Sequence, residues 1–319
     1  GGCDFRHLDY AEELWAKRQR VQDALTRIGG LDLTVEEILG AKNPEHYRNK
    51  SQYPVGADGA IGFYRARSHQ VVPVKRCLIQ PEAADKTAAA VGEWMRRYKV
   101  PAYDEATGKG LVRHVYVRVN RKGESLCCVV INGRQAPREP ELAAYVCAAV
   151  PHTAGVLVNS NTKRGNVILG EKYRTLWGRD YLMDTLCGLE FKLSVPSFYQ
   201  VNRDQAEALY GKALDYAGLT GRETVLDLYC GIGTITLCLA KRAGRVIGAE
   251  IVPAAIRDAK ENAARNHIEN AEFFCGDAAE TAARLEAEGL RPDVITVDPP
   301  RQGLAPEVIG TIAAMGPER

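Results

Sequence analysis

The sequence predicts an α/β protein of two domains, in which a mixed α+β domain precedes a doubly wound parallel sheet. Strand-length apolar runs alternate with helical patterns through residues 196–319, an order that requires parallel strands joined by crossover helices. Residues 33–195 instead contain short alternating runs bounded by turn residues, which is typical of antiparallel strands. A chain of 319 residues is long enough for two hydrophobic cores.

The composition is that of an ordinary globular protein. Hydrophobic residues make up 45% of the chain and charged residues 26%, and no apolar run approaches the ~18 residues of a membrane span. The nine cysteines have no regular spacing, which favours reduced thiols and a cytoplasmic protein. No secretory signal pattern is visible, and nothing in the sequence indicates an obligate protein partner.

Charge is divided unevenly along the chain. Residues 1–195 hold 29 Lys and Arg against 22 Asp and Glu, a net +7, whereas residues 196–319 hold 13 against 18, a net −5. A basic domain joined to an acidic one indicates that the first domain meets a polyanion such as RNA. Solvated surface charge on both domains is the alternative that these counts leave open.

Residues 1–32 are expected to form a linker helix after a short cysteine-bearing start. Apolar residues at helical spacing mark one face of this helix: Tyr10, Leu14, Val21, Leu25 and Ile28. The pair Gly29-Gly30 should end it. The opening Gly-Gly-Cys3 suggests a chain cut from a longer one.

Residues 33–195 are predicted to form a basic, RNA-facing α+β domain. Helices are expected at 82–98 and 139–149, and strands between 47 and 77, in a hairpin of residues 111–119 and 125–132, and at 154–160, 165–170, 181–186 and 189–194. Arg65 and Arg67 alternate with apolar neighbours and should project from one face of a sheet. Arg113 and Arg118 belong to the hairpin. We expect these four arginines to contact RNA phosphates.

Residues 196–319 begin with a junction, SVPSFYQVN, and a helix over 203–218. Strands are then predicted at 224–230, 245–251, 271–277 and 293–298, each followed by a helix, at 234–243, 253–266, 278–288 and 305–315. A doubly wound sheet normally has further strands. We therefore expect a partial Rossmann-like sheet that stops where a fifth strand is due.

The run TVLDLYCGIG, residues 224–233, is the centre of this second domain. It reads as a buried strand that turns sharply into a helix, the place where doubly wound sheets hold nucleotide-like ligands. Gly231 and Gly233 allow the backbone to approach a ligand that a Cβ atom would exclude. Cys230 at this turn is expected to be a packing residue.

Three carboxylates end successive strands, namely Glu250, Asp277 and Asp298. Because parallel strands end at one rim, these acids should converge near the glycines. Glu250 suits ribose hydroxyls, and Asp277 suits an adenine amino group. The third glycine of a dinucleotide fingerprint is missing, and Asp227 would repel a pyrophosphate. S-adenosylmethionine, which has a cationic amino group and no phosphate, is the favoured cofactor; a nicotinamide or flavin cofactor and a degenerate pocket are the alternatives.

The run Asp298-Pro299-Pro300-Arg301 holds the backbone rigid after the fourth strand. Asp298 can accept a hydrogen bond from an imide N–H, as in uracil. An ordinary strand exit with proline stops is the alternative interpretation.

Taken together, SFYQVN, VLDLYCGIGTIT, Glu250, Asp277 and DPPRQG resemble the RNA (uracil-5-)-methyltransferases. The resemblance spans the chain, because GGCDFRH at its start is similar to the end of that family's cluster motif. It implies S-adenosylmethionine as cofactor and uracil C5 in 23S ribosomal RNA as target, with tRNA as the alternative substrate. The residues implied to bound the cofactor and base pocket are Gln200, Tyr229, Gly231, Gly233, Thr234, Glu250, Asp277 and Asp298. Cys3 and Cys77 would be two of four ligands of a [4Fe–4S] cluster in the full-length protein.

The sequence departs from the family pattern at both ends. The two other cluster cysteines would precede Gly1, as would a small β-barrel domain. The nucleophilic cysteine and the glutamate base are expected after Arg319. Since uracil C5 needs a thiolate at C6 before it can accept a methyl group, we expect this chain alone to hold the cofactor without turnover. A noncatalytic RNA- or cofactor-binding module is therefore the remaining alternative.

Overall fold

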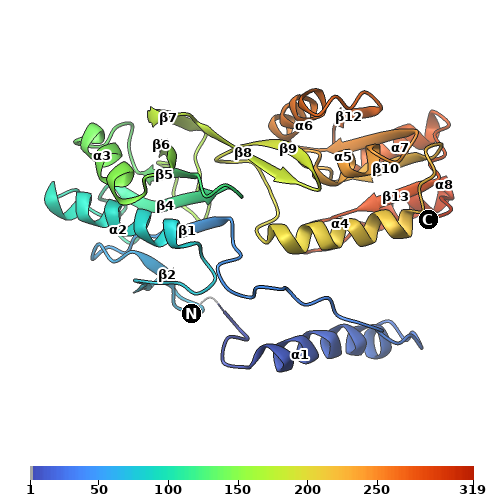
Figure 1. Ribbon diagram of the computed structural model, residues 1–319, viewed down its shortest axis with the longest axis horizontal. Helices are drawn as coiled ribbons and strands as arrows, with labels where there is room; N and C mark the ends of the chain where they lie inside the picture. Colours follow the sequence, from blue (N-terminus) through green and yellow to red (C-terminus); the bar gives the residue numbers. More distant parts are fainter. Residues whose placement is uncertain (1–2) are drawn as a thin grey trace. The chain divides into compact units, whose positions relative to one another are not determined.

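The computed structural model describes residues 3–319 and divides into two compact units (Figure 1). The first comprises residues up to 118 together with 127–177, and the second comprises 119–126 and 178–319. Gly1 and Gly2, which belong to the segment similar to the end of the cluster motif, lie outside the described residues. In the described chain no helix is both long and apolar enough to cross a membrane.

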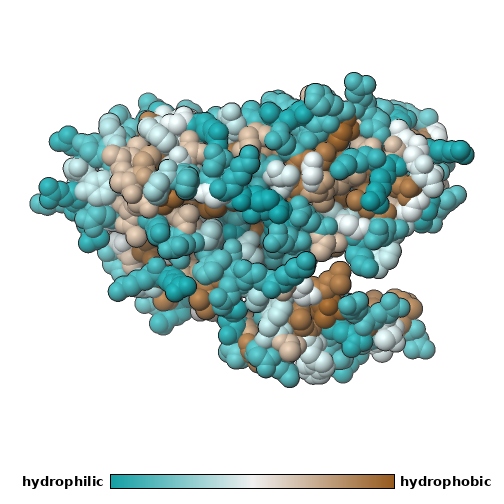
Figure 2. Space-filling view, in the orientation of Figure 1, coloured by the Kyte–Doolittle hydropathy of each residue, from teal (hydrophilic) through white to brown (hydrophobic). Residues whose placement is uncertain are grey.

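The predicted N-terminal helix is present but buries none of its side chains. Helix α1 (Tyr10–Asp23) begins at Asp9, whose carboxylate accepts a hydrogen bond from Glu12 N at 2.9 Å, and it continues as one π-helical turn, η1 (Ala24–Ile28). Ile28 is 87% exposed. Hydrophobic side chains therefore reach the surface over this segment (Figure 2).

The first unit is built on a five-stranded sheet in the order β1-β4-β5-β6-β7. Helices α2 (Glu82–Arg97) and α3 (Glu139–Ala149) accompany it, and the indole of buried Trp94 donates to Arg138 O at 3.1 Å. A separate hairpin joins β2 (Gly62–Tyr64) to β3 (Val71–Pro73). The sheet strands are β1 (Lys50–Pro54), β4 (Val112–Val119), β5 (Ser125–Ile131), β6 (Thr153–Ser160) and β7 (Lys172–Gly178).

One strand of this unit was predicted in the wrong place. Residues 165–170 are not extended, and β7 begins at Lys172 instead. The side chain of buried Asn161 donates to Val167 O at 2.6 Å and to Ile168 O at 3.0 Å. These side-chain bonds occupy carbonyls that a strand would pair with its neighbour, so the apolar run folds as a loop.

The second unit carries the predicted doubly wound sheet, with parallel strands in the order β12-β11-β10-β13. Helix α4 (Arg203–Ala217) precedes it. The strands are β10 (Thr224–Leu228), β11 (Arg245–Glu250), β12 (Ala271–Cys275) and β13 (Val294–Val297). The helices that follow them are α5 (Thr234–Ala240), α6 (Pro253–Arg265), α7 (Ala278–Ala287) and α8 (Pro306–Met315). The predicted α/β class, with its Rossmann-like sheet, is confirmed.

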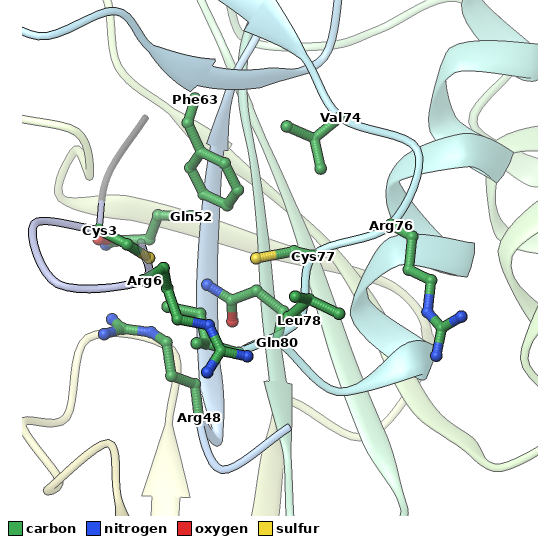
Figure 3. A pocket seen from close by; sticks show the side chains of 11 residues that line it. Cys3, Arg6, Arg48, Gln52, Phe63, Val74, Arg76, Cys77, Leu78 and Gln80 are labelled. Atoms are coloured by element: carbon green, nitrogen blue, oxygen red, sulfur yellow. The ribbon is translucent and has the colours of Figure 1, made fainter. Parts of the chain in front are cut away.

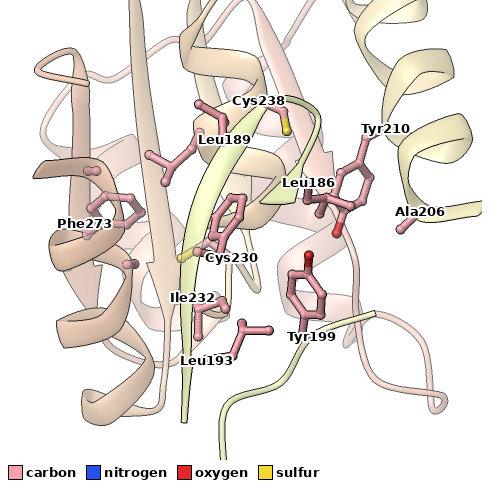
Figure 4. Packing of buried hydrophobic residues seen from close by; sticks show 14 of the residues in the cluster. Leu186, Leu189, Leu193, Tyr199, Ala206, Tyr210, Cys230, Ile232, Cys238 and Phe273 are labelled. Carbon is pink, nitrogen blue, oxygen red and sulfur yellow. The ribbon is translucent and has the colours of Figure 1, made fainter. Parts of the chain in front are cut away.

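Hydrophobic clusters cover the sheet. One joins α4, α5 and α6 to the hairpin β8–β9 (Tyr181–Leu186, Leu189–Ser194), with Tyr199, Tyr210 and Phe273 among its members (Figure 4). Another joins α7 and α8 to β10 and β11 through residues such as Leu226, Ile247 and Val308. The hairpin thus packs within the second unit, whereas the sequence placed the domain boundary after residue 195.

Candidate functional site

The sheet order places the candidate site between β10 and β13. Across the sheet the four strands lie in the order 3-2-1-4, numbered by their position in the chain. The chain therefore proceeds from β10 to β11 and β12 on one side, and β13 then pairs with the other side of β10. Ligands of such sheets bind outside the carboxyl ends of the strands at this switch point. The turn Tyr229–Gly233 follows β10, and Asp298 follows β13 directly.

The turn after β10 has a left-handed backbone at three positions. The φ angles are +67° at Tyr229, +56° at Gly231 and +83° at Gly233. A Cβ atom on Gly233 would lie 3.3 Å from both Ala259 Cβ and the Phe273 ring. Gly233 is therefore needed for its φ angle and for packing of the turn against α6 and β12. The sequence pattern instead predicts that glycine here lets the backbone approach a ligand.

Glu250 secures this turn from the end of β11. Its carboxylate accepts hydrogen bonds from Gly231 N at 3.2 Å and from Val252 N at 2.9 Å. A carboxylate has about four lone-pair directions, so Glu250 retains acceptor capacity for a ligand hydroxyl. The predicted ribose role is compatible with this geometry, and the second role as a turn anchor was not foreseen.

Asp277 holds the start of α7. Its carboxylate accepts from Ala279 N at 2.9 Å and Glu280 N at 3.4 Å as an N-cap. One oxygen atom makes both bonds, which leaves the other oxygen for the predicted adenine contact. The run Asp277-Ala278-Ala279-Glu280 has the pattern of a helix N-cap, whereas the prediction from the sequence gives Asp277 only a ligand role.

Asp298 and Gln200 are brought together from positions 98 residues apart. Gln200 Nε2 donates to Asp298 Oδ2 at 3.3 Å. Asp298 is exposed and Gln200 is half-buried. Two of the residues implied to face the target base therefore present an amide and a carboxylate side by side. Thr234 lies at the start of α5, where its hydroxyl is 2.9 Å from the Tyr210 hydroxyl.

Beneath these residues lies a buried carboxylate, Asp227, which is only 1% exposed. It accepts hydrogen bonds from the Thr236 hydroxyl on α5 and, at 2.9 Å, from the Thr296 hydroxyl on β13. Burial raises the pKa of Asp227 to about 7, although both hydrogen bonds favour the ionised form. Asp227 thus joins α5, which begins after the Tyr229–Gly233 turn, to β13, the strand that precedes Asp298.

Sequence reasoning missed the residues that support the turn from behind. Asn262 is fully buried on α6 and donates to Ile232 O at 3.2 Å. Thr236 and Thr296 hold Asp227, as described above. A polar residue on a helix gives no sign of such a partner, because the partner comes from another element. Cys230 is buried, and burial raises the pKa of its thiol, which agrees with the packing role expected for it.

In the first unit, Cys3 and Cys77 line one pocket of about 580 Å³. Figure 3 shows both sulfur atoms pointing into the same space. Cys77 is fixed through its backbone, because its N–H donates to Asp85 Oδ2 at 2.8 Å. Three arginines also line the pocket, namely Arg6, Arg48 and Arg76. No group of three or more His, Cys, Asp or Glu side chains suited to a metal occurs among residues 3–319.

The four arginines predicted to contact RNA divide into two pairs. Arg65 and Arg67 are exposed, but they lie in the turn between β2 and β3 rather than on a sheet face, because β2 ends at Tyr64. Arg113 and Arg118 are only 4% and 2% exposed. Arg113 Nη1 donates to Asn161 O and Lys163 O, each at 2.8 Å. The prediction of RNA contact is wrong for Arg113 and Arg118, because both guanidinium groups belong to the interior of the unit.

Comparison with known proteins shows which family the chain resembles. Residues 219–314 match a family described as "Methyltransferase domain". The whole chain is 44% identical to an uncharacterized RNA methyltransferase of Halalkalibacterium halodurans, over 71% of that protein. It is 42% identical to one of Clostridium tetani, over 70% of that protein.

A solved structure has the same fold along nearly the whole chain. The tRNA (uracil-54, C5)-methyltransferase of Pyrococcus abyssi, in complex with S-adenosyl-L-homocysteine, matches with a TM-score of 0.82 and 24% identity. The match covers 99% of this chain and 74% of that one.

Proposed function

Because this chain belongs to the RNA methyltransferase family, we propose that it serves the S-adenosylmethionine-dependent methylation of uracil C5 in RNA, with 23S ribosomal RNA as substrate. The observation that carries the proposal is the Gln200–Asp298 pair at the switch point of the sheet, next to the Tyr229–Gly233 turn. An amide and a carboxylate together can accept from the N–H of a uracil ring and donate to its carbonyl oxygen.

The acids of this rim favour a cationic cofactor. The carboxylates of Glu250, Asp277 and Asp298 receive their hydrogen bonds from backbone amides and one side-chain amide. None of these donors is a cation, so the negative charge of the three carboxylates is available to the sulfonium and amino groups of S-adenosylmethionine. Gly231, Gly233, Tyr229 and Thr234 would shape the surface on which the cofactor lies.

The chemistry requires a thiolate and a base in addition to the residues that bind the cofactor and the uracil. A thiolate adds to C6 of uracil, which makes C5 an enolate carbon that attacks the sulfonium methyl group and releases S-adenosylhomocysteine. A base then removes the C5 proton, and the C6–S bond breaks. The roles left to residues 3–319 are to bind the cofactor and to orient an unstacked uracil through Gln200 and Asp298.

Product analysis tests the proposal. The full-length product of the parent gene, supplied with S-adenosylmethionine carrying a deuterated methyl group, is expected to form deuterated 5-methyluridine in 23S ribosomal RNA from cells that lack the gene. Label in the transfer RNA fraction instead would assign the second candidate substrate, which the fold shared with the Pyrococcus abyssi enzyme favours. Label in another nucleoside would refute uracil C5 as the target. Absence of any label would favour the noncatalytic RNA- or cofactor-binding module.

Replacing Asp298 with asparagine should weaken capture of uridine-containing RNA more than it weakens cofactor binding. The isosteric amide can still pair with Gln200 but loses the charge that favours a hydrogen bond from the uracil N–H, which is worth about 1–3 kcal/mol. Titration of each ligand against wild type and variant measures both affinities. Equal losses would remove the base-binding role. Asp293→Asn is a poor control, because Asp293 accepts from Thr224 N; exposed Asp180→Asn is the matched one.

We also propose that Cys3 and Cys77 are two of four thiolate ligands of a [4Fe–4S] cluster in the full-length protein. Such clusters take four cysteines, and the shared pocket fits half of that set. A cluster with four thiolates is anionic, and Arg6, Arg48 and Arg76 around the pocket would offset its charge. Iron and sulfide analysis of the anaerobically purified full-length protein, with Cys77→Ser beside Cys147→Ser as control, is expected to show loss of iron only in the first variant. Equal iron in both would refute the assignment.

A further inference from the structure

The first unit contains a second, smaller cavity that none of the roles above uses. Its volume is about 210 Å³, which corresponds to roughly seven water molecules of liquid. Four segments line it: Val55–Ala57 directly after β1, the β2–β3 hairpin, the loop Tyr103–Ala106, and β4. The side chains that matter for the argument are Tyr64, His69, Tyr103, Glu105, Arg113 and His114.

Aromatic groups supply much of the lining. The rings of Tyr64 and His69 lie 5.2 Å apart with an angle of 36° between their planes. The Arg113 guanidinium lies 4.6 Å from the centre of the Tyr103 ring. His69 Nδ1 is hydrogen-bonded to the Glu105 carboxylate, which holds the imidazole at the wall. Flat, polarizable walls of this kind favour a flat aromatic ligand over a small ion.

A neutral histidine completes this wall. His114 lines the cavity and is 6% exposed. Burial and the neighbouring Arg113 charge lower the pKa of His114 to about 4, so its imidazole is neutral at pH 7. Its Nδ1 atom is buried and forms no hydrogen bond with any described residue, so the ring contributes a flat, uncharged surface to the wall.

The mouth of the cavity carries cations from two loops. The turn that supplies Tyr64 and His69 also bears the exposed Arg65 and Arg67. Arg113 donates to Lys163 O at 2.8 Å, so the loop with exposed Lys163 and Arg164 starts beside the cavity. An aromatic slot with a cationic rim matches a nucleotide, in which a flat base adjoins a phosphate.

We propose that this cavity binds one unstacked nucleobase of the RNA substrate, at a nucleotide other than the target uridine. The inference rests on the proposed function, because it takes the ligand to be single-stranded RNA. The base stacks against Tyr64 and His69, beside the uncharged ring of His114. Arg65, Arg67, Lys163 and Arg164 hold the adjoining phosphates. A second base held in this way would fix the register in which the target base reaches the methyl donor.

The test uses a fluorescently labelled single-stranded RNA dodecamer that contains uridine and measures its affinity by anisotropy. Tyr64→Leu and His69→Ala should each weaken binding about 5- to 100-fold, because base–aromatic stacking is lost. His152→Ala is the matched control, since His152 is an exposed histidine of the same unit and lies outside the cavity. It should bind as the wild type does. Thermal unfolding of each variant identifies any that fails to fold.

A scan with abasic nucleotides separates base binding from phosphate binding. In the wild type, one abasic position other than the target should weaken binding, and in Tyr64→Leu the same position should have no further effect. Arg67→Gln should lower the salt dependence of binding and leave the abasic effect intact. Wild-type RNA binding with no loss in Tyr64→Leu and His69→Ala, or with no sensitive abasic position, would overturn this proposal alone. Absence of RNA binding by the wild-type protein would instead refute the proposed function.

Discussion

The variant Glu250→Ala is expected to bind S-adenosylmethionine about 10- to 100-fold more weakly than the wild type. Glu250 accepts from Gly231 N and Val252 N and keeps acceptor capacity for a ribose hydroxyl. Its removal takes away the ligand contact and leaves the part-buried Gly231 N–H without its partner, and an unsatisfied donor of this kind costs about 1–3 kcal/mol. Both losses weaken binding, because the cofactor-bound state requires the ribose contact and an ordered turn at Gly231.

Isothermal titration with S-adenosylmethionine measures this effect. Glu269→Ala is the control, because Glu269 is exposed and lies in the loop between α6 and β12. It should leave the affinity unchanged. Glu250→Gln distinguishes the two roles of the residue, since a glutamine oxygen can still accept from the amides but carries no charge. An affinity for Glu250→Ala equal to that of wild type would contradict the cofactor site described above.

The variant Asp227→Asn is expected to change how the stability of the protein depends on pH. The pKa of Asp227 is about 7 in the folded protein and near its ordinary value of 3.8 when unfolded. Between these values the folded state binds the proton that the unfolded state has released. The wild-type free energy of unfolding therefore falls as the pH rises from about 4 to about 7, by an amount on the order of 4 kcal/mol for this group. Asparagine cannot titrate, so its variant should lack this decline.

Urea unfolding at pH 5 and at pH 7.5 measures the difference. All other titrating groups are shared by the two proteins, so their contributions cancel in the comparison. From pH 5 to pH 7.5 the free energy of unfolding should therefore fall more for wild type than for Asp227→Asn. Asp180→Asn serves as control, because Asp180 is an exposed aspartate of the same unit. The same decline in Asp227→Asn and wild type would show that Asp227 is ionised at pH 5 despite its burial.

The same carboxylate links the two halves of the candidate site. Thr236 belongs to the helix that begins at the cofactor turn, and Thr296 lies two residues before Asp298. A group that holds both elements can transmit a change at one to the other. Asp227→Asn is therefore a useful companion to Asp298→Asn, because similar effects on both ligands are expected for the first and a larger effect on RNA for the second.

The arginines of the first unit show where the sequence pattern misleads. Arg113 belongs to the predicted hairpin, yet its guanidinium donates hydrogen bonds to the carbonyls of Asn161 and Lys163. Arg65 and Arg67 alternate with apolar neighbours but lie in a turn. Spacing tells which residues share a side of a strand. Whether that side faces water depends on loops that come from elsewhere in the chain.

The sequence by itself determined the elements and their order, because apolar periodicity, glycine turns and helix caps act over a few residues. It therefore predicted the parallel sheet, the sharp turn at Gly231 and Gly233, and the acids at the strand ends. Only the tertiary structure decided which side chains meet. The Gln200–Asp298 pair, the Thr236–Asp227–Thr296 bridge and the cavity around His114 each join residues far apart in the chain. Such contacts depend on how elements pack, and packing is set by the shape and burial of whole faces rather than by any local run of residues.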